Sequence, residues 1–304
     1  MVMKERREKK RRKKAEAATL GREPFGFADV IIYIIMGLLV LTMLIPFLNI
    51  VAISLSGYEA AVSNTSMLFP KDFTLSAYEI LLKPEVYRAL GVTTFVTIAN
   101  TALHIVLCMM LAYPLTQKNL PGRKFLMTLV LIPMLFSGGT IPMYILYKEL
   151  GLADNILVYI LPGVVSGYTV VLMRNFISQI PDSLEEAALL DGANYWQILW
   201  RIVVPLSKPI IATMALFNAV GVWNNWFTGV LFIRNDNLKL IQNVLREMLI
   251  EGNMGAFGSL TQQQSYEVSV QMAAIVISII PIFMVYPFIQ RYFIKGMNIG
   301  SVKG

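Results

Sequence analysis

Six long stretches of the chain contain only apolar and uncharged residues, and they set its expected architecture. No Asp, Glu, Lys or Arg occurs in residues 30–58, 89–117, 125–147, 155–173, 209–233 and 268–290. Each stretch has at least 19 residues, close to the about 20 that a helix needs to cross roughly 30 Å of hydrocarbon. A water-soluble core helix keeps charge on its outer face, and a membrane barrel shows period-2 alternation. The pattern therefore predicts an all-α membrane protein with six transmembrane helices.

The same pattern predicts two parts, a basic cytoplasmic tail at 1–28 and a transmembrane domain at 29–304. We place the spans at about 30–54, 89–115, 125–147, 155–175, 209–233 and 268–290. Seven prolines and a Ser-Gly-Gly sequence interrupt the apolar runs: Pro46, Pro114, Pro133, Pro142, Pro162, Pro281, Pro287 and Ser137-Gly138-Gly139. Packing kinks explain single prolines, but their number favours a moving bundle that lines a cavity.

Composition and charge agree with this architecture and predict its orientation. Of all residues 56% are hydrophobic and 15% are charged, whereas a soluble domain has about 25% charged residues. Ten of the 26 Lys and Arg lie in 1–29, and three lie in each of 118–124, 174–208 and 291–304. Because cytoplasmic loops carry the excess of Lys and Arg, these four segments are predicted to be cytoplasmic. The first apolar run is much longer than the roughly 7–15 residues of a signal peptide.

A dense basic run, Lys4-Glu5-Arg6-Arg7-Glu8-Lys9-Lys10-Arg11-Arg12-Lys13-Lys14, supplies much of the formal net charge of +7. It could be a nucleic-acid patch, but a solvated tail that fixes topology and touches anionic lipid fits it better. We therefore expect the lipid bilayer and no nucleic acid as a partner. The single cysteine, Cys108, lies within the second span, so it cannot form an intramolecular disulfide and is expected to be a small packed hydrophobe.

The spans lack the groups that ion-coupled carriers and membrane enzymes use. Carriers place Asp, Glu or His in the membrane, and only His104 is available here. It fits a hydrogen bond to a neighbouring helix better than a proton relay. His104 and Cys108 share a helix face, but no carboxylate in any span could orient them, so we expect no catalytic residue and no metal site. The chain has no phosphate loop, so energy would come from a partner; an ion-coupled secondary carrier is the alternative.

The loop between the fourth and fifth spans, residues 181–208, begins with a helical pattern. Ser183 followed by Glu186 is a capping-box pattern, which predicts a helix that starts at about Leu184. Gly192 is the expected left-handed residue that ends it. Small Ala187 and Ala188 would let another body approach the helix closely.

A second short helix is predicted from about Asn194 to Val203, ending before Pro205. It carries much apolar surface, with Tyr195, Trp196, Ile198, Leu199, Trp200 and Ile202. Such surface needs a partner. The two helices could therefore dock against another protein or pack beneath the bundle as interfacial helices, and composition leaves both interpretations open.

The loop resembles the EAA loop of ABC importer permeases. Glu186-Ala187-Ala188 is followed after three residues by Gly192, and after nine more by Ile202-x-Val204-Pro205. Val204 stands where the family pattern has leucine, which is a conservative departure. Three further segments, in the third span, the fifth span and the C-terminal tail, are similar to carbohydrate-uptake permeases: 134–142, 223–227 and 290–304. The similarity, over about 25–304, is to the smaller maltose-type subunit in its oligo- and polysaccharide branch.

This resemblance implies a type I ABC importer permease fold in the bacterial cytoplasmic (inner) membrane, with both termini cytoplasmic. It implies a heterodimer with a second permease subunit, two ATP-binding cassette subunits that hold ATP and Mg, and an extracytoplasmic solute-binding protein that delivers an oligosaccharide. This chain would hold no cofactor and would be no enzyme. The residues that would couple it to the ATPases are Glu185, Glu186, Ala187, Ala188, Asp191 and Gly192.

Polar and aromatic residues within the spans are the candidates for sugar contacts. Aromatic faces and amide groups bind sugars in otherwise apolar pockets, which draws attention to Trp223, Asn224, Asn225, Trp226, Asn100 and Tyr144. Such groups also hold membrane helices together. The sequence leaves both roles open for each of them.

Overall fold

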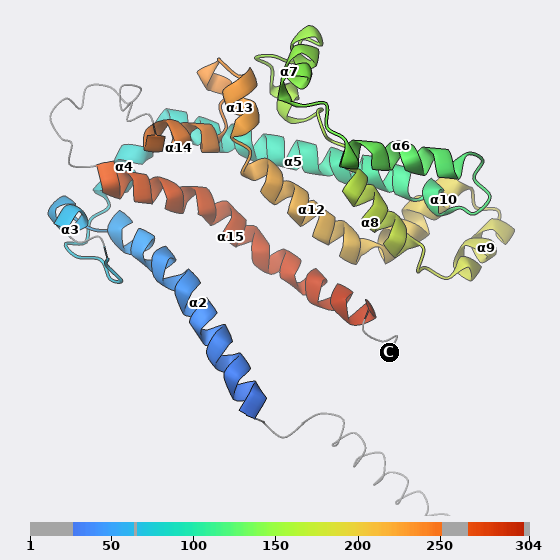
Figure 1. Ribbon diagram of the computed structural model, residues 1–304, viewed down its shortest axis with the longest axis horizontal. Helices are drawn as coiled ribbons and strands as arrows, with labels where there is room; N and C mark the ends of the chain where they lie inside the picture. Colours follow the sequence, from blue (N-terminus) through green and yellow to red (C-terminus); the bar gives the residue numbers. More distant parts are fainter. Residues whose placement is uncertain (1–26, 64–65, 251–266, 301–304) are drawn as a thin grey trace, which may run out of the picture.

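The computed structural model describes residues 27–63, 66–250 and 267–300, and every regular element within these ranges is helical (Figure 1). The longest helices are α2 (Phe27–Ser54), α5 (Pro84–Ala112), α12 (Lys208–Trp223) and α15 (Glu267–Gly300). Those of intermediate length are α6 (Arg123–Leu135), α7 (Thr140–Glu149), α8 (Gly167–Ile177), α9 (Asp182–Leu190) and α14 (Ile241–Ile250). Most of the predicted tail (1–28) and residues 301–304 of the C-terminal motif lie outside the described ranges.

Short helices and turns connect the longer ones. They are α3 (Tyr58–Ser63), α4 (Ser76–Leu81), η1 (Pro114–Thr116), η2 (Ile156–Tyr159), α10 (Tyr195–Ile198), η3 (Leu199–Val203), α11 (Val204–Leu206), α13 (Phe227–Phe232) and η4 (Asp236–Leu238). Of these, η1, η2 and η4 are 3-10 turns, whereas η3 is a π turn.

Helix α5 is the central element of the bundle. It packs against α12, α8 and α14. Helix α12 packs in turn against α15, and α15 also packs against α2. Figure 1 shows α4 and α14 near one end of α5, and α9 and α10 near the other. At the α9 end, a buried cluster that includes Met109, Met173, Leu199 and Met214 joins α5, α8, η3 and α12. Ala188 of α9 packs against this cluster.

The structure corrects the continuity of three predicted spans. The span at 125–147 is divided into α6 and α7, whose axes differ by 113°. Gly139 has a φ of +86° at the start of α7, a value that only glycine adopts readily. The span at 155–175 contains η2, an irregular stretch with Pro162, and α8. The span at 209–233 ends as α12 at Trp223 and resumes as α13.

In the described ranges, two helices are long and apolar enough to cross a membrane by themselves, α2 and α5 with its following turn. Up to four qualify when each bent helix pair is counted as one span. The second such pair is α10–α11 with α12, bent by 79°. The count of six crossings stays a prediction from the sequence.

Candidate functional site

Helix α9 forms the first half of the predicted coupling loop, and it begins earlier than expected. It starts at Asp182, its N-cap is Pro181, and no side chain caps it. The predicted capping box of Ser183 and Glu186 is therefore wrong. The φ of Pro181 is −59°, and Asp182 and Glu185 lie in the first turn, where negative charge is favourable beside the helix N-terminus. Proline and first-turn carboxylates thus replace the cap.

Gly192 ends α9 as predicted. Its φ is +78°, its N–H donates to the Leu189 carbonyl at 3.0 Å, and the Ala193 N–H donates to the Ala188 carbonyl at 2.9 Å. This pair of bonds is a Schellman motif, which satisfies the last carbonyls of the helix. A Cβ at Gly192 would meet no atom within 4 Å, so the glycine serves backbone conformation and not packing.

The second helix of the loop is longer than predicted. The Asn194 side chain accepts from the Gln197 N–H, and the Gln197 side chain accepts from the Asn194 N–H, so a capping box forms here. The helix does not end before Pro205 but continues through a π turn to Leu206. A proline has no N–H to donate, and the wider π turn directly before it changes the hydrogen-bond spacing at this point.

The two adjacent glutamates of α9 face different surroundings. Glu185 is half-buried; its carboxylate accepts from the Tyr113 hydroxyl at 3.0 Å and from Gln117 Nε2 at 2.9 and 3.1 Å. Ala188, one turn later, packs against the buried cluster at this end of the bundle. Glu186 and Ala187 are exposed. The helix therefore has an inner edge and an outer edge, a division that the sequence did not reveal.

A cavity of about 550 Å³ lies along α9. Its walls come from α9, from the turn after α5, and from α8 and α10–η3. Lining residues include Gln117, Arg123, Arg174, Leu184, Glu185, Glu186 and Tyr195. Exposed apolar side chains continue along α9 and α10, with Leu190 exposed by 89% and Trp196 by 57%. Asp191 is also exposed. This end can receive another protein.

Two of the predicted sugar contacts are used in packing within this chain. The Asn100 amide donates to the carbonyls of Tyr159 and Ile160, and its oxygen accepts from Asn218. Trp223 is exposed by only 5%, and its indole N–H donates to the Ser278 carbonyl at 3.0 Å. Both side chains join α5, α12 and their neighbours, as the helix-packing interpretation expects.

The remaining candidates lie where α12 gives way to α13. Asn225 caps this break, accepting from the Thr228 N–H and donating to its hydroxyl. Asn224 and Trp226 are exposed. The Tyr144 ring stacks on Phe232 of α13, with centroids 5.3 Å apart. A role of these residues in sugar binding stays a prediction.

Two residues of α14, Gln242 and Arg246, join this group and were missed in the sequence. Gln242 donates to the Asn224 side chain at 3.3 Å, and the Arg246 guanidinium lies 4.2 Å from the centre of the Trp226 ring. The sequence does contain a helical pattern here, because Gln242 and Arg246 are four residues apart and share one face of the helix. Ile241 and Leu245 of the same helix are buried. The separation of α14 from α12 along the chain hid the contact.

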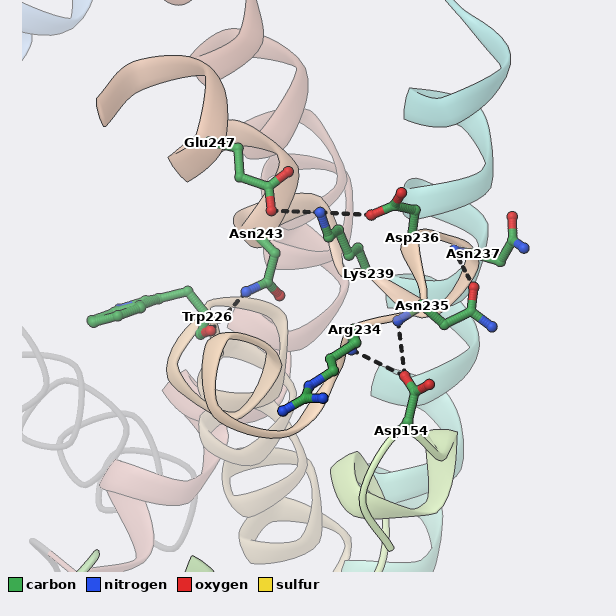
Figure 2. Close-up of polar contacts among 9 residues, drawn as sticks. All are labelled: Asp154, Trp226, Arg234, Asn235, Asp236, Asn237, Lys239, Asn243 and Glu247. Carbon is green, nitrogen blue, oxygen red and sulfur yellow. Dashed lines mark hydrogen bonds and ion pairs between the residues drawn. The ribbon is translucent and has the colours of Figure 1, made fainter. Parts of the chain in front are cut away.

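A polar network fixes the connection between α13 and α14 (Figure 2). One oxygen of Asp154 accepts from the backbone N–H groups of Arg234 and Asn235, at 3.0 and 2.8 Å. The bonds from Asn235 and Arg234 hold the pKa of Asp154 below its usual value. Asp154 itself has a φ of +54°, a left-handed conformation that Asp and Asn tolerate better than other side chains. Asp154 thus ties the end of α13 to the loop before η2.

Lys239 holds the other half of this network. Its ammonium lies between Asp236 at 2.8 Å and Glu247 at 2.6 Å. The hydrogen bond and charge of Lys239 lower the pKa of Asp236. Burial acts to lower the pKa of Lys239, but the bonds to Asp236 and Glu247 outweigh it, and the pKa is raised. Asn243 donates to the Trp226 carbonyl at 2.8 Å and places α14 against α13.

The only histidine has the structural role that the sequence favoured. His104 is buried, with Nδ1 2.7 Å from the Val164 carbonyl and Nε2 3.1 Å from the Thr169 hydroxyl. Cys108 is fully buried beside it, with Sγ 3.8 Å from Nδ1. Among the described residues, no group of three or more His, Cys, Asp or Glu is arranged to hold a metal ion.

The chain is similar to known transport proteins along most of its length. The family described as "Binding-protein-dependent transport system inner membrane component" matches residues 20–299. Protein LplC of Bacillus subtilis (strain 168) is 43% identical over 265 residues, covering 86% of this chain and 90% of LplC. The polygalacturonan/rhamnogalacturonan transport system permease protein YtcP of the same strain is 41% identical over 283 residues. The match covers 91% of this chain and 98% of YtcP.

A solved structure matches the fold. A chain in the crystal structure of a bacterial ABC transporter involved in the import of the acidic polysaccharide alginate superimposes with a TM-score of 0.81 and 30% identity. The match covers 90% of this chain and all of that chain. The breaks in the helices and the α9 turn thus occur within a chain similar along its length to an importer subunit.

Proposed function

The chain belongs to the family of binding-protein-dependent transport system inner membrane components, and we propose that it forms half of the transmembrane pathway of an ATP-driven importer for oligosaccharides. It has the type I importer permease fold of that family. The observation that carries the proposal is the outer edge of α9: Glu186 and Ala187 are exposed on a helix whose end is fixed by Gly192.

The substrate class follows from the relatives. YtcP is described as a transporter of polygalacturonan and rhamnogalacturonan, and the solved transporter imports alginate, an acidic polysaccharide. An exposed Trp226 with Arg246 over its ring, beside Asn224 and Gln242, offers an aromatic face, a cation and amides. Those are the groups that bind a sugar ring and its hydroxyl or carboxylate groups.

Coupling to ATP would run through α9. Two ATPase subunits would close on binding ATP, and the outer edge of α9 would sit in a cleft of one of them. Moving a two-state bundle from 1:99 to 99:1 takes about 5.5 kcal/mol of differential binding. A helix held by a Schellman turn and by contacts to the bundle can transmit that difference, whereas a flexible loop would absorb it.

The proposed assembly contains this chain, a second permease, two ATPases and an extracytoplasmic sugar-binding protein. This chain is a non-catalytic subunit in the cytoplasmic membrane, with both termini and α9 on the cytoplasmic side. ATP and Mg are held by the ATPases. The basic segments at 1–29, 118–124 and 174–208 support that orientation.

The test is reconstitution of the chain in liposomes with its permease partner, ATPases and binding protein. Uptake of labelled oligogalacturonides and neutral oligosaccharides of matched length is measured with ATP or with a non-hydrolysable analogue inside the vesicles. We expect uptake only with ATP and only with the binding protein. Uptake that survives without ATP and collapses with an ion gradient would establish the secondary carrier instead.

A further inference from the structure

The turn that ends α5, residues 113–118, is a joint to which three other helices are tied. The Leu115 carbonyl accepts from Arg123 Nε of α6 at 2.9 Å and from Arg174 Nε of α8 at 3.2 Å. The Thr116 hydroxyl donates to the Tyr113 carbonyl within the turn. Because two arginines bind one carbonyl, the turn keeps a fixed place between α6 and α8.

Helix α9 joins this turn through Glu185. Its carboxylate accepts from the Tyr113 hydroxyl and from Gln117 Nε2, at 2.9 to 3.1 Å. Hydrogen bonds to an ionised group are roughly twice as strong as neutral ones, and Glu185 is half-buried, which strengthens them further. A second link, the ion pair of Lys118 with Asp182, has side chains exposed by 80% and 72%; such a pair contributes little.

Helix α5 connects this turn to the rest of the bundle. Beyond the turn, the same helix carries Asn100, which binds Asn218 of α12 and the carbonyls of Tyr159 and Ile160. A displacement of α9 that is transmitted to residues 113–118 therefore acts on a helix that α8, α12 and α14 all pack against. Among the described residues, two carboxylates of α9 form a bond to that turn. They are Glu185 and Asp182, and the bond of Asp182 is the exposed ion pair with Lys118.

We propose that Glu185 is a positioning residue that ties α9 to the end of α5, and that neighbouring Glu186 serves a separate role at the ATPase. The inference rests on the proposed function, and it gives different contacts to two adjacent glutamates that both line the cavity along α9. Glu186 is exposed and sits about 100° around the helix from Glu185. Motion received at the outer edge passes to the bundle through the inner edge. Without Glu185, the ATPases still bind and close, but α9 moves without taking α5 with it.

The experiment compares Glu185→Gln with Glu186→Gln in the reconstituted complex. Glutamine at position 185 keeps an amide oxygen that can accept but loses the charge, which roughly halves the strength of the bonds from Tyr113 and Gln117, so in E185Q we expect the oligosaccharide imported per ATP hydrolysed to fall severalfold. Binding of the ATPases to the permeases stays within about twofold of the parent. E186Q shows the reverse, with weaker ATPase binding and unchanged import per ATP in the complexes that remain. Glu79→Gln, at an exposed carboxylate of α4, is the control and changes neither.

A double-mutant cycle identifies the partners of Glu185. Tyr113→Phe with Gln117→Ala removes both donors, and in that background E185Q is expected to cause no further loss of import per ATP. Additive losses would show that Glu185 acts elsewhere. A structural role alone would lower the yield or melting temperature of the complex without changing the ratio.

Distances between spin labels provide an independent readout. With buried Cys108 replaced by serine, labels at Leu190→Cys on α9 and Asn119→Cys beyond the turn should give one narrow distance in the parent and a broad distribution in E185Q. An unchanged distribution together with an unchanged import ratio would overturn the proposal. The same is true if E185Q weakens ATPase binding as E186Q does. A parent complex without sugar-stimulated ATP hydrolysis would refute the proposed function instead.

Discussion

Gly192 shows how one residue can fix the angle between two helices. Its φ of +78° and its bond to the Leu189 carbonyl both end α9 and direct the chain into α10. Proline would set φ near −65° and remove the N–H, so the Schellman turn could not form. We expect Gly192→Pro to abolish uptake and sugar-stimulated ATP hydrolysis while the chain still inserts in the membrane, as measured in the reconstituted complex.

Gly192→Ala tests whether the backbone conformation or the absence of a side chain is what matters at this position. A methyl group would meet no atom within 4 Å, and the left-handed conformation costs alanine about 1–2 kcal/mol. Alanine should therefore reduce transport only partly. Parental uptake by Gly192→Pro would show that α9 is not the coupling element.

Asp154 gives a residue-scale prediction about pH. Backbone N–H groups of Asn235 and Arg234 lower its pKa, so its contribution to holding the loop is complete above the ordinary Asp pKa of about 3.9. It is lost as the pH falls through the lowered pKa. Hydrogen exchange of the 233–240 segment, corrected for intrinsic rates, should accelerate in that acidic range. Asp154→Asn tolerates the same left-handed backbone but has no charge to titrate, so its exchange should show no such step.

At the scale of elements, Asn100 holds three of them together. Its amide serves the carbonyls of Tyr159 and Ile160 and the side chain of Asn218. Asn100→Ala leaves these groups unpaired, at a cost of about 1–3 kcal/mol. We expect a lower melting temperature of the purified complex and unchanged preference among oligosaccharides. A changed preference with unchanged stability would instead support Asn100 as a sugar contact.

How far the sequence predicts these elements depends on the range of the interactions that shape them. Local signals succeeded: Gly192 requires its left-handed turn, and the apolar run of α2 is continuous. The run at 125–147 looked equally continuous, because apolar composition does not reveal a bend. Pro133 and Gly139 are compatible with a bend between α6 and α7, but a continuous transmembrane helix also tolerates such residues. The Ser183 capping box failed because Pro181 took the N-cap position.

Contacts between distant parts of the chain were beyond sequence reasoning. Glu185 and Tyr113 are 72 residues apart, and nothing in the spacing of either indicates the other. Arg246 and Trp226 meet for a similar reason, because α14 folds back over the α12–α13 break. The sequence drew attention to the loop at 181–208 and the polar stretch at 223–226, but the residues that orient them are brought there by packing.

For the whole molecule, topology is the first test. The distribution of basic residues predicts that 1–29, 118–124, 174–208 and 291–304 lie on the cytoplasmic side. Single cysteines at positions 10, 120, 190 or 300, in a chain with Cys108 replaced, should be labelled only from the cytoplasm. Cysteines at positions 65 and 255 should be labelled from outside. External labelling at 120 or 190 would overturn the six-span arrangement.

The surface of the bundle supports the proposal that this chain works with a second permease. No residue of α6 or α7 is buried, although both helices are rich in apolar side chains. Leu135 of α6, Ile141 of α7 and Phe136 in the break between them are each exposed by more than 70%. Lipid can cover such side chains, but it cannot satisfy the bent backbone at 136–139. Irregular backbone at membrane depth is tolerated where it is buried in protein or lines a water-filled cavity. A second permease would provide both.

We therefore expect the isolated chain in liposomes to take up no oligosaccharide, and the chain with its permease partner, ATPases and binding protein to do so. The partner should also raise the melting temperature of this chain, since anything that binds only the folded state stabilises it. Exchange of backbone amides at 136–139 should slow when the partner is present, because that break then lies at an interface. Uptake by the isolated chain, or identical exchange with and without the partner, would show that one copy of this bundle encloses the pathway alone.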